Sequence, residues 1–268
     1  MTTTQKIIKY LALALAIFII VTIFTAVISL FQGLFGMFSK DKSNTDINSS
    51  NVFVDSSSYI DINLKYASLY IKKGNTLTVE SNNKRIDIIQ SSNKLSIIEK
   101  KNKPFKINKD EKVVLYIPND FIFDVVNIES GAGSIYIDEL YADDLSLNLG
   151  VGKTDINNIT AQKANIETGA GKVSIKKGML NNADIEVGVG KLFYSGILTG
   201  KTEIETGIGS TTLSLSSYES DYRFNISKGL GSITYNGESI SNDTTIGTGD
   251  NEINIDGGIG SIKIEYLN

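Results

Sequence analysis

The chain of 268 residues contains no cysteine, no histidine and no tryptophan, and it has only two prolines. Without cysteine, neither a disulfide nor a thiolate metal site can form. Without histidine, the commonest general base and the commonest metal ligand are both missing. Nucleophiles activated by histidine are therefore excluded, and we expect a protein that is not an enzyme and holds no cofactor and no metal.

A basic charge balance is also missing. Lysine and arginine together number 26, against 30 aspartates and glutamates, which gives a formal net charge of −4. Nucleic-acid binding depends mainly on a basic surface that neutralises phosphates. This balance predicts no nucleic-acid partner.

One long apolar segment, residues 10–38, carries no charged residue. It exceeds the roughly 20 apolar residues that a helix needs to cross a bilayer. A cleaved signal peptide would have a shorter apolar core and a small-residue cleavage site, which the end of this segment lacks. The sequence therefore predicts an uncleaved transmembrane helix at residues 10–38, with the bilayer as its partner. Because residues 1–9 carry only positive charge, they are expected to be cytoplasmic.

Residues 39–51 are rich in serine, asparagine and aspartate, which is typical of a flexible linker. The remaining residues, 52–268, form the predicted folded domain. The expected localisation is the cell membrane, with a single pass and an extracytoplasmic domain.

A Gly-x-Gly triplet recurs every 19 residues in the second half of the chain. Two looser copies begin at Gly229 and Gly258. A fixed period near 20 is typical of a solenoid, in which each repeat is one coil that stacks on its neighbours. We therefore predict an all-β, single-stranded β-solenoid (β-helix) with coils of about 19 residues. The corner glycines of the strict copies are Gly131, Gly133, Gly150, Gly152, Gly169, Gly171, Gly188, Gly190, Gly207 and Gly209.

Within each coil, apolar residues alternate with polar ones and recur at the same positions, for example Ile166 and Ile185. Alternation with period two predicts strands, here two short ones per coil, such as residues 134–137 and 144–149. The two glycines of a triplet predict a corner with positive φ and close backbone approach. The residue between them, such as Val189, is expected to point inward.

The ends of the domain are less regular. Residues 52–130 alternate without the glycine triplet and are predicted to be irregular opening coils, before the Gly-x-Gly repeats of residues 131–268. The insertions at residues 216–222 and 238–251 are expected to be loops. The alternating segment 261–267 is expected to leave an exposed strand edge.

Two outward positions carry charge in successive coils. Lys153, Lys172 and Lys191 follow the second glycine of their triplets, and an equivalent series of glutamates, residues 167, 186 and 205, lies across the corner. Two interpretations stay open. The rows are either a solvated face with balanced charge, or the lysines form a track for an anionic polymer of the cell wall.

Three segments resemble a known bacterial pattern: VVLYIP at residues 113–118, FDVVNI at 123–128 and GAGSI at 131–135. The pattern is similar to that of a family of adhesin-like proteins built from β-strand repeats, a domain of unknown function related to the toast-rack domains. The resemblance continues through the glycine repeats, over roughly residues 51–268. It implies a cell-envelope protein with a role in surface adhesion or in envelope-stress sensing, and it supplies no catalytic residues.

Our leading functional interpretation is a membrane-anchored, non-enzymatic binding or scaffold module that engages an envelope membrane protein or an anionic wall polymer. The second interpretation is an adhesin that binds wall polymer or a host surface. The third is a polysaccharide-active enzyme using carboxylates such as Asp143 and Asp144, which would need two carboxylates at a defined separation.

Overall fold

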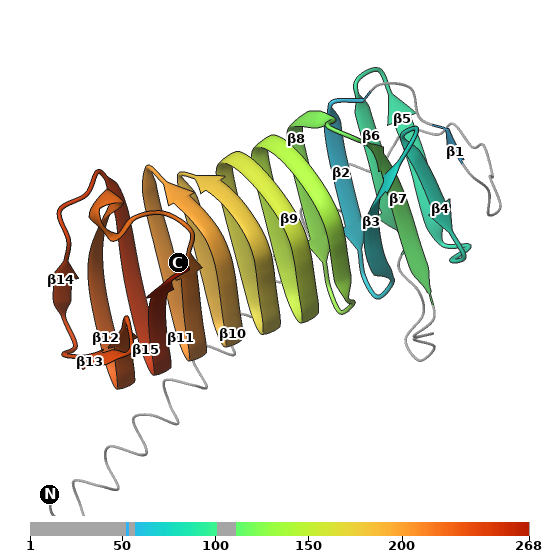
Figure 1. Ribbon diagram of the computed structural model, residues 1–268. Coiled ribbons are helices and arrows are strands. Elements are labelled where there is room, and N and C mark those ends of the chain that lie inside the picture. Colours follow the sequence, from blue (N-terminus) through green and yellow to red (C-terminus); the bar gives the residue numbers. More distant parts are fainter. Residues whose placement is uncertain (1–51, 54–56, 101–110, 268) are drawn as a thin grey trace, which may run out of the picture. The chain divides into compact units, whose positions relative to one another are not determined.

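The computed structural model describes residues 52–53, 57–100 and 111–267 (Figure 1). In this part the elements are β-strands and one 3-10 turn, η1 (Glu219–Asp221), so the all-β prediction is confirmed. None of the helices among these residues has the length and apolar character to span a bilayer. The predicted transmembrane helix (10–38), cytoplasmic segment (1–9) and linker (39–51) lie outside the described residues.

Fifteen strands belong to one sheet. In chain order they are β1 (Val52–Phe53), β2 (Tyr59–Leu64), β3 (Ser68–Gly74), β4 (Thr78–Ser81), β5 (Ile86–Ser91), β6 (Lys94–Glu99), β7 (Lys112–Pro118), β8 (Ile122–Ser130), β9 (Ile135–Asn181), β10 (Ala183–Thr199), β11 (Lys201–Leu215), β12 (Tyr222–Tyr235), β13 (Glu238–Ile240), β14 (Thr244–Ile246) and β15 (Asn251–Tyr266).

The central strands form a solenoid with the predicted period. β10 pairs in parallel with β9 and β11, and Ile185 lies between Ile166 and Ile204, each 19 residues away. Side chains one coil apart also bond to each other: Lys176 Nζ donates to Asn157 Oδ1 at 2.8 Å. The predicted division of each coil into two short strands is wrong, because β9 alone runs for 47 residues around successive corners. Glycine lets the backbone bend while the pairing between coils continues.

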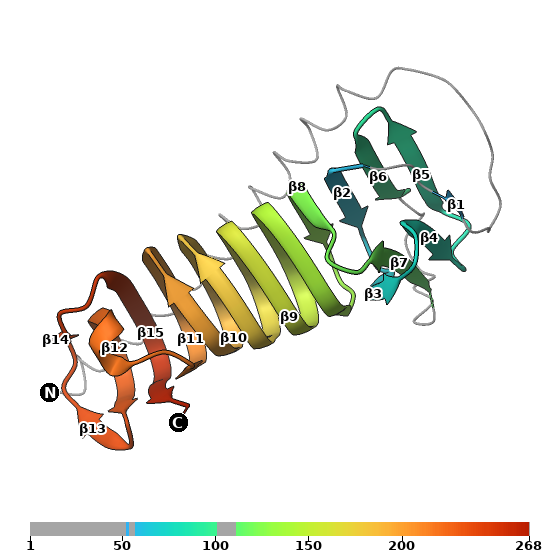
Figure 2. The same ribbon diagram turned by 45° about the horizontal axis from the view of Figure 1, so that its top comes forward.

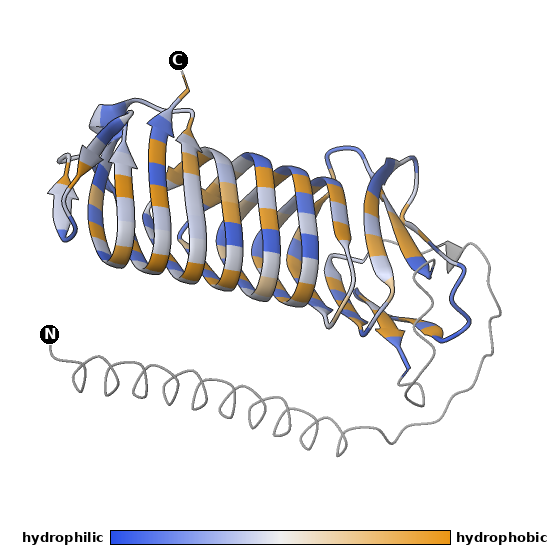
Figure 3. Cartoon of the chain, turned by 90° about the horizontal axis from the view of Figure 1, so that it is seen from below, coloured by the Kyte–Doolittle hydropathy of each residue, from blue (hydrophilic) through white to orange (hydrophobic). Residues whose placement is uncertain are grey.

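The core is a set of stacked inward side chains. Ile166, Ile185 and Ile204 are fully buried, as the alternation predicts. Figure 3 shows the alternation as bands of hydrophobic and hydrophilic residues along the coils. Burying one such side chain contributes about 1.5–3 kcal/mol, so the repeated ladders supply most of the driving force for stacking.

At the C-terminal end, the coils do not stack in chain order. β15 lies between β11 and β12, and the outermost coil is β12, whose edge is covered by β13 and β14 in antiparallel pairing (Figure 1). The predicted exposed edge at residues 261–267 is therefore wrong. The prediction of a simple loop at residues 238–251 is wrong too, because this insertion holds two capping strands. Residues 216–222 do form a connection, with η1 inside it.

The N-terminal end has the same arrangement. β2 lies between β8 and β6, and β3 lies between β9 and β7, so the coil of β6 and β7 is the outer one (Figure 2). Antiparallel strands β5 and β4 pair with the outer edges of β6 and β7. Both ends thus cover their outer coils with short antiparallel strands, a usual way to block edge-to-edge association.

Candidate functional site: the glycine corner

The corner depends on the second glycine of each triplet. Gly152, Gly171, Gly190 and Gly209 have φ between +150° and +156°. The first glycines have no positive φ, and neither does Gly133, so the prediction of positive φ holds only for the second glycines of the later triplets. The first glycines serve close approach instead: a Cβ on Gly188 would lie 2.6 Å from the carbonyl oxygen of Gly169. Both glycines are needed because neighbouring coils pack backbone to backbone at this corner.

The residue between the two glycines points outward, which corrects the prediction. Val151, Val189 and Ile208 are 61%, 51% and 46% exposed. Period-two alternation places Val189 on the same side as the buried Val187. The pairing of β10 with β11, however, passes from Val187 to Val189 without pairing Gly188, which interrupts the alternation.

These residues form a continuous row along the solenoid, which we call the corner ridge. Its members stack in register from coil to coil, including across the exchanged order of β15 and β12. Because all seven members are apolar and five of them are exposed, branched side chains, the row is an apolar strip at the surface. In spatial order the corner ridge consists of Ala132, Val151, Ala170, Val189, Ile208, Ile259 and Leu230.

The lysine row lies two residues after the ridge, in three successive coils. Lys153, Lys172 and Lys191 are exposed, as predicted, and Lys191 pairs in register with Lys172. Lys153 forms an ion pair with Asp155, whose hydrogen bond raises the pKa of the lysine. The row therefore offers two further ammonium groups, on adjacent coils, beside the ridge.

The acidic row lies three residues before the ridge. It consists of Glu167, Glu186, Glu205 and Asp256, paired in register on successive coils. Partial burial raises the pKa of Glu186 above its usual range, and the neighbouring carboxylates of Glu167 and Glu205 raise it further. Like charges directly opposite each other on neighbouring strands are unfavourable. The corner thus presents an apolar ridge between a basic row and an acidic row.

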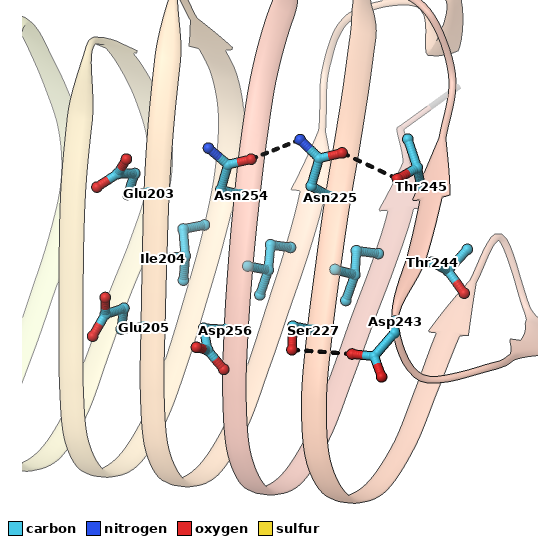
Figure 4. Close-up of a pocket in the computed structure, with 12 residues that line it drawn as sticks. Glu203, Ile204, Glu205, Asn225, Ser227, Asp243, Thr244, Thr245, Asn254 and Asp256 are labelled. Atoms are coloured by element: carbon cyan, nitrogen blue, oxygen red, sulfur yellow. Dashed lines mark hydrogen bonds between the residues drawn. The ribbon is translucent and has the colours of Figure 1, made fainter.

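A groove of about 580 Å³ lies on the acidic face, at the C-terminal end (Figure 4). Its asparagine side chains are hydrogen-bonded within the groove: Asn225 donates to Asn254 at 2.8 Å, and Thr245 donates to Asn225 at 3.2 Å. Among the described residues, no group of three or more acidic side chains is placed to hold a metal ion. We therefore take the corner as the candidate site.

Asp143 and Asp144, the carboxylates considered for a polysaccharide-active enzyme, have no arginine as a partner among the described residues. Asp143 and Asp144 are exposed. Arg223 bonds to Glu252 at 2.7 Å. The other arginine, residue 85, binds carboxylates in the N-terminal cap. Each arginine is therefore already engaged in an ion pair.

A buried carboxylate in the N-terminal cap was not expected. The side chain of Glu99 is fully buried and accepts hydrogen bonds from the backbone N–H groups of Lys65, Tyr66 and Ala67 at 2.8–3.0 Å. Asn83 and Arg85 each donate a further bond at 3.1 Å.

Burial by itself raises the pKa of Glu99, but the hydrogen bonds from Tyr66, Ala67 and Lys65 outweigh it and hold the pKa below the usual value. The sequence does contain a signal for this site, because Glu99 follows Leu95 and Ile97 on the inward phase of its strand. A charged residue at an inward position predicts a set of buried partners.

A stack of 19-residue coils with capped ends and charged rows on its surface defines a β-solenoid domain. The family model described as Toastrack DUF4097 matches residues 44–265, and the chain therefore belongs to this family of unknown function. The resemblance seen in the sequence is confirmed. No curated protein matches the chain.

Solved structures with a similar chain path come from bacterial proteins described as adhesion proteins. One, a "putative cell adhesion protein" from Clostridium sporogenes, is 16% identical, with a TM-score of 0.35, over 82% of this chain and 99% of its own. Another, a "putative adhesin" from Bacteroides fragilis, is 14% identical, with a TM-score of 0.42, over 81% and 96%. The assignment of the chain to the Toastrack family rests on the match to the family model and not on these solved structures.

Proposed function

We propose that this chain is a non-enzymatic binding module of the cell envelope, held at the membrane by residues 10–38. In this proposal the corner ridge of the solenoid binds another protein. The observation that carries the proposal is the row of exposed apolar side chains that continues over successive coils. Contiguous apolar surface on a folded domain marks interaction sites. The hydrogen-bonded stack holds these side chains in fixed positions, so little ordering is needed when a partner binds.

The proposal is tested by a photo-crosslinking amino acid placed in the full-length protein in cells. We expect position 189, in the middle of the ridge, to give protein adducts. The matched control is position 179, where Met179 is 53% exposed and lies outside the ridge. An adduct with a membrane protein of the same cell would identify a scaffold or signalling component, and an adduct with an external protein would identify an adhesin. Equal adduct yields at the two positions would refute the proposal.

The lysine row favours a second candidate, binding of an anionic wall polymer. For this candidate we expect Lys172→Ala to weaken binding to polyglycerol phosphate about fivefold, because one lysine at an anionic surface contributes about 1 kcal/mol. The stability should change by less than about 0.5 kcal/mol, since the side chain is exposed. Co-sedimentation at low and high salt, together with urea unfolding, measures both effects.

Lys163→Ala is the control, because it removes the same charge from an exposed position outside the row. If both variants weaken the binding of polyglycerol phosphate equally, the polymer is attracted by the net charge of the protein alone. That result would count against a polymer track on the lysine row.

A further inference from the structure

The corner carries positive charge on one side of the ridge and negative charge on the other, so two copies of it can be complementary in charge. On the coil of Ala170, the lysine row contributes Lys172 and the acidic row contributes Glu167. On the next coil, the corresponding pair is Lys191 and Glu186. Within one coil, the two charged groups lie on opposite sides of the ridge, so the ridge separates them.

Two copies of such a ridge can meet face to face with two-fold symmetry in two ways. If the solenoids run in opposite directions, the lysine row faces the other lysine row and the acidic row faces the other acidic row. If they run in the same direction, with the two-fold axis along the solenoid, each lysine row faces an acidic row. Opposed like charges are unfavourable, so the charge pattern selects the second arrangement.

We infer that the corner ridge binds a second copy of this chain, with the two solenoids packed ridge to ridge and running in the same direction. The inference rests on the proposed function, since it names the partner of the same site. In this arrangement Lys172 faces Glu167 of the second copy, and Lys191 faces Glu186 of the second copy. Each ridge residue faces the same residue across the axis.

The two signs of charge at the corner argue against other partners. An anionic lipid surface or polymer would be attracted by the lysine row but repelled by Glu167, Glu186, Glu205 and Asp256 on the other side of the ridge. Glu186 lies in register between Glu167 and Glu205, so like charges oppose each other along the acidic row. A lysine row from a second copy would place opposite charges beside them.

The size of the ridge predicts weak association. Seven coils at about 4.8 Å give a strip about 29 Å long. A strip roughly 10 Å wide would bury about 300 Å² per copy, well below the roughly 800 Å² per partner of a standard interface. We therefore expect pairing that depends on local concentration, and it is best measured in the membranes of cells that make the full-length protein.

Disulfide crosslinking tests the pairing and its direction. The native chain has no cysteine, so one introduced cysteine is the only thiol. Val151 and Ile259 are the second and sixth of the seven ridge positions. Packing in the same direction predicts that Val151→Cys and Ile259→Cys each form disulfide dimers with their own kind, at roughly tenfold the yield of the exposed control Met179→Cys.

Packing in opposite directions predicts the reverse. Dimers would form only when the Val151→Cys and Ile259→Cys chains, carrying tags of different size, are made together. This result, or yields no higher than that of the Met179→Cys control, would overturn the inference.

Charge reversal provides an independent test. Lys172→Glu with Lys191→Glu should lower the dimer yield of Val151→Cys roughly tenfold, because acidic rows would then face each other. Adding Glu167→Lys and Glu186→Lys to the same chain exchanges the two rows and should restore the yield. A loss without recovery would argue against direct pairing of the rows.

The outcomes separate this inference from the proposed function. Photo-adducts with another protein at position 189, without cysteine dimers, would reject the second copy and leave the binding module standing. Adducts with lipid or polymer alone would reject both.

Discussion

Glu99→Ala is expected to lower the free energy of unfolding by about 3–5 kcal/mol, because it removes one partner of a buried charged network. The backbone donors of Lys65, Tyr66 and Ala67 would lose their acceptor inside the N-terminal cap. Arg85 would keep its bonds to Glu111 and Asn83 but lose its buried partner. Urea unfolding of the full-length protein at pH 7 measures the loss.

The same carboxylate predicts a dependence on pH. The pKa of Glu99 in the folded protein lies below the ordinary value of 4.5. Ionised Glu99 therefore stabilises the fold at pH values above 4.5, and this contribution is lost as the pH falls through the folded pKa. The difference in stability between the native protein and Glu99→Ala should accordingly shrink on acidification.

The control for this prediction is Glu80→Ala in the same cap. Its carboxylate is only partly buried and accepts a bond from the Tyr116 hydroxyl at 3.2 Å. We expect a loss below about 1 kcal/mol. A loss from Glu99→Ala that is no larger, or that does not change with pH, would contradict the role of Glu99 as a buried anion.

Gly190→Ala is expected to cost about 3 kcal/mol or more, for two separate reasons. The φ of Gly190 is +150°, a conformation that costs a residue with a Cβ about 1–3 kcal/mol. The added methyl group would also overlap the carbonyl oxygen of Gly171 in the preceding coil. Overpacking of this kind costs about 1–3 kcal/mol more, because the coils would have to separate.

Gly237→Ala separates these two contributions. Gly237 also has a positive φ, +85°, but a Cβ there meets nothing within 4 Å. This variant should lose only the conformational part, about 1 kcal/mol. If the two variants lose equal stability in urea unfolding, close packing of the coils at the glycine corner is not what requires Gly190.

The candidate site was predicted only in part. Lys153, Lys172 and Lys191 recur at one position of the 19-residue period, and they are exposed on successive coils as expected. The ridge between them and the acidic row is exposed, although the sequence predicts inward side chains there. Alternation counts residues along a regular strand and cannot register an unpaired residue such as Gly188, which shifts all following side chains to the opposite face.

The ends of the solenoid show a second limit of the sequence. The spacing of the glycine triplets becomes irregular after Gly207, and chain order suggests that the next coil is the one with Gly229. In the structure the coil of Gly258 stacks on Gly207 instead. Which coil comes next depends on pairing between segments about 50 residues apart, and no local pattern encodes that choice.

The sequence by itself determined the solenoid, the length of its coils, its inward ladders and its outward charged rows. All of these follow from a fixed period, since each coil repeats the environment of the previous one. Only the tertiary structure decided the exchanged order of the end coils, the burial of Glu99 among backbone donors and the exposure of the corner ridge. These three features depend on contacts between distant segments and on one unpaired residue per corner, and a periodic pattern carries no information about either.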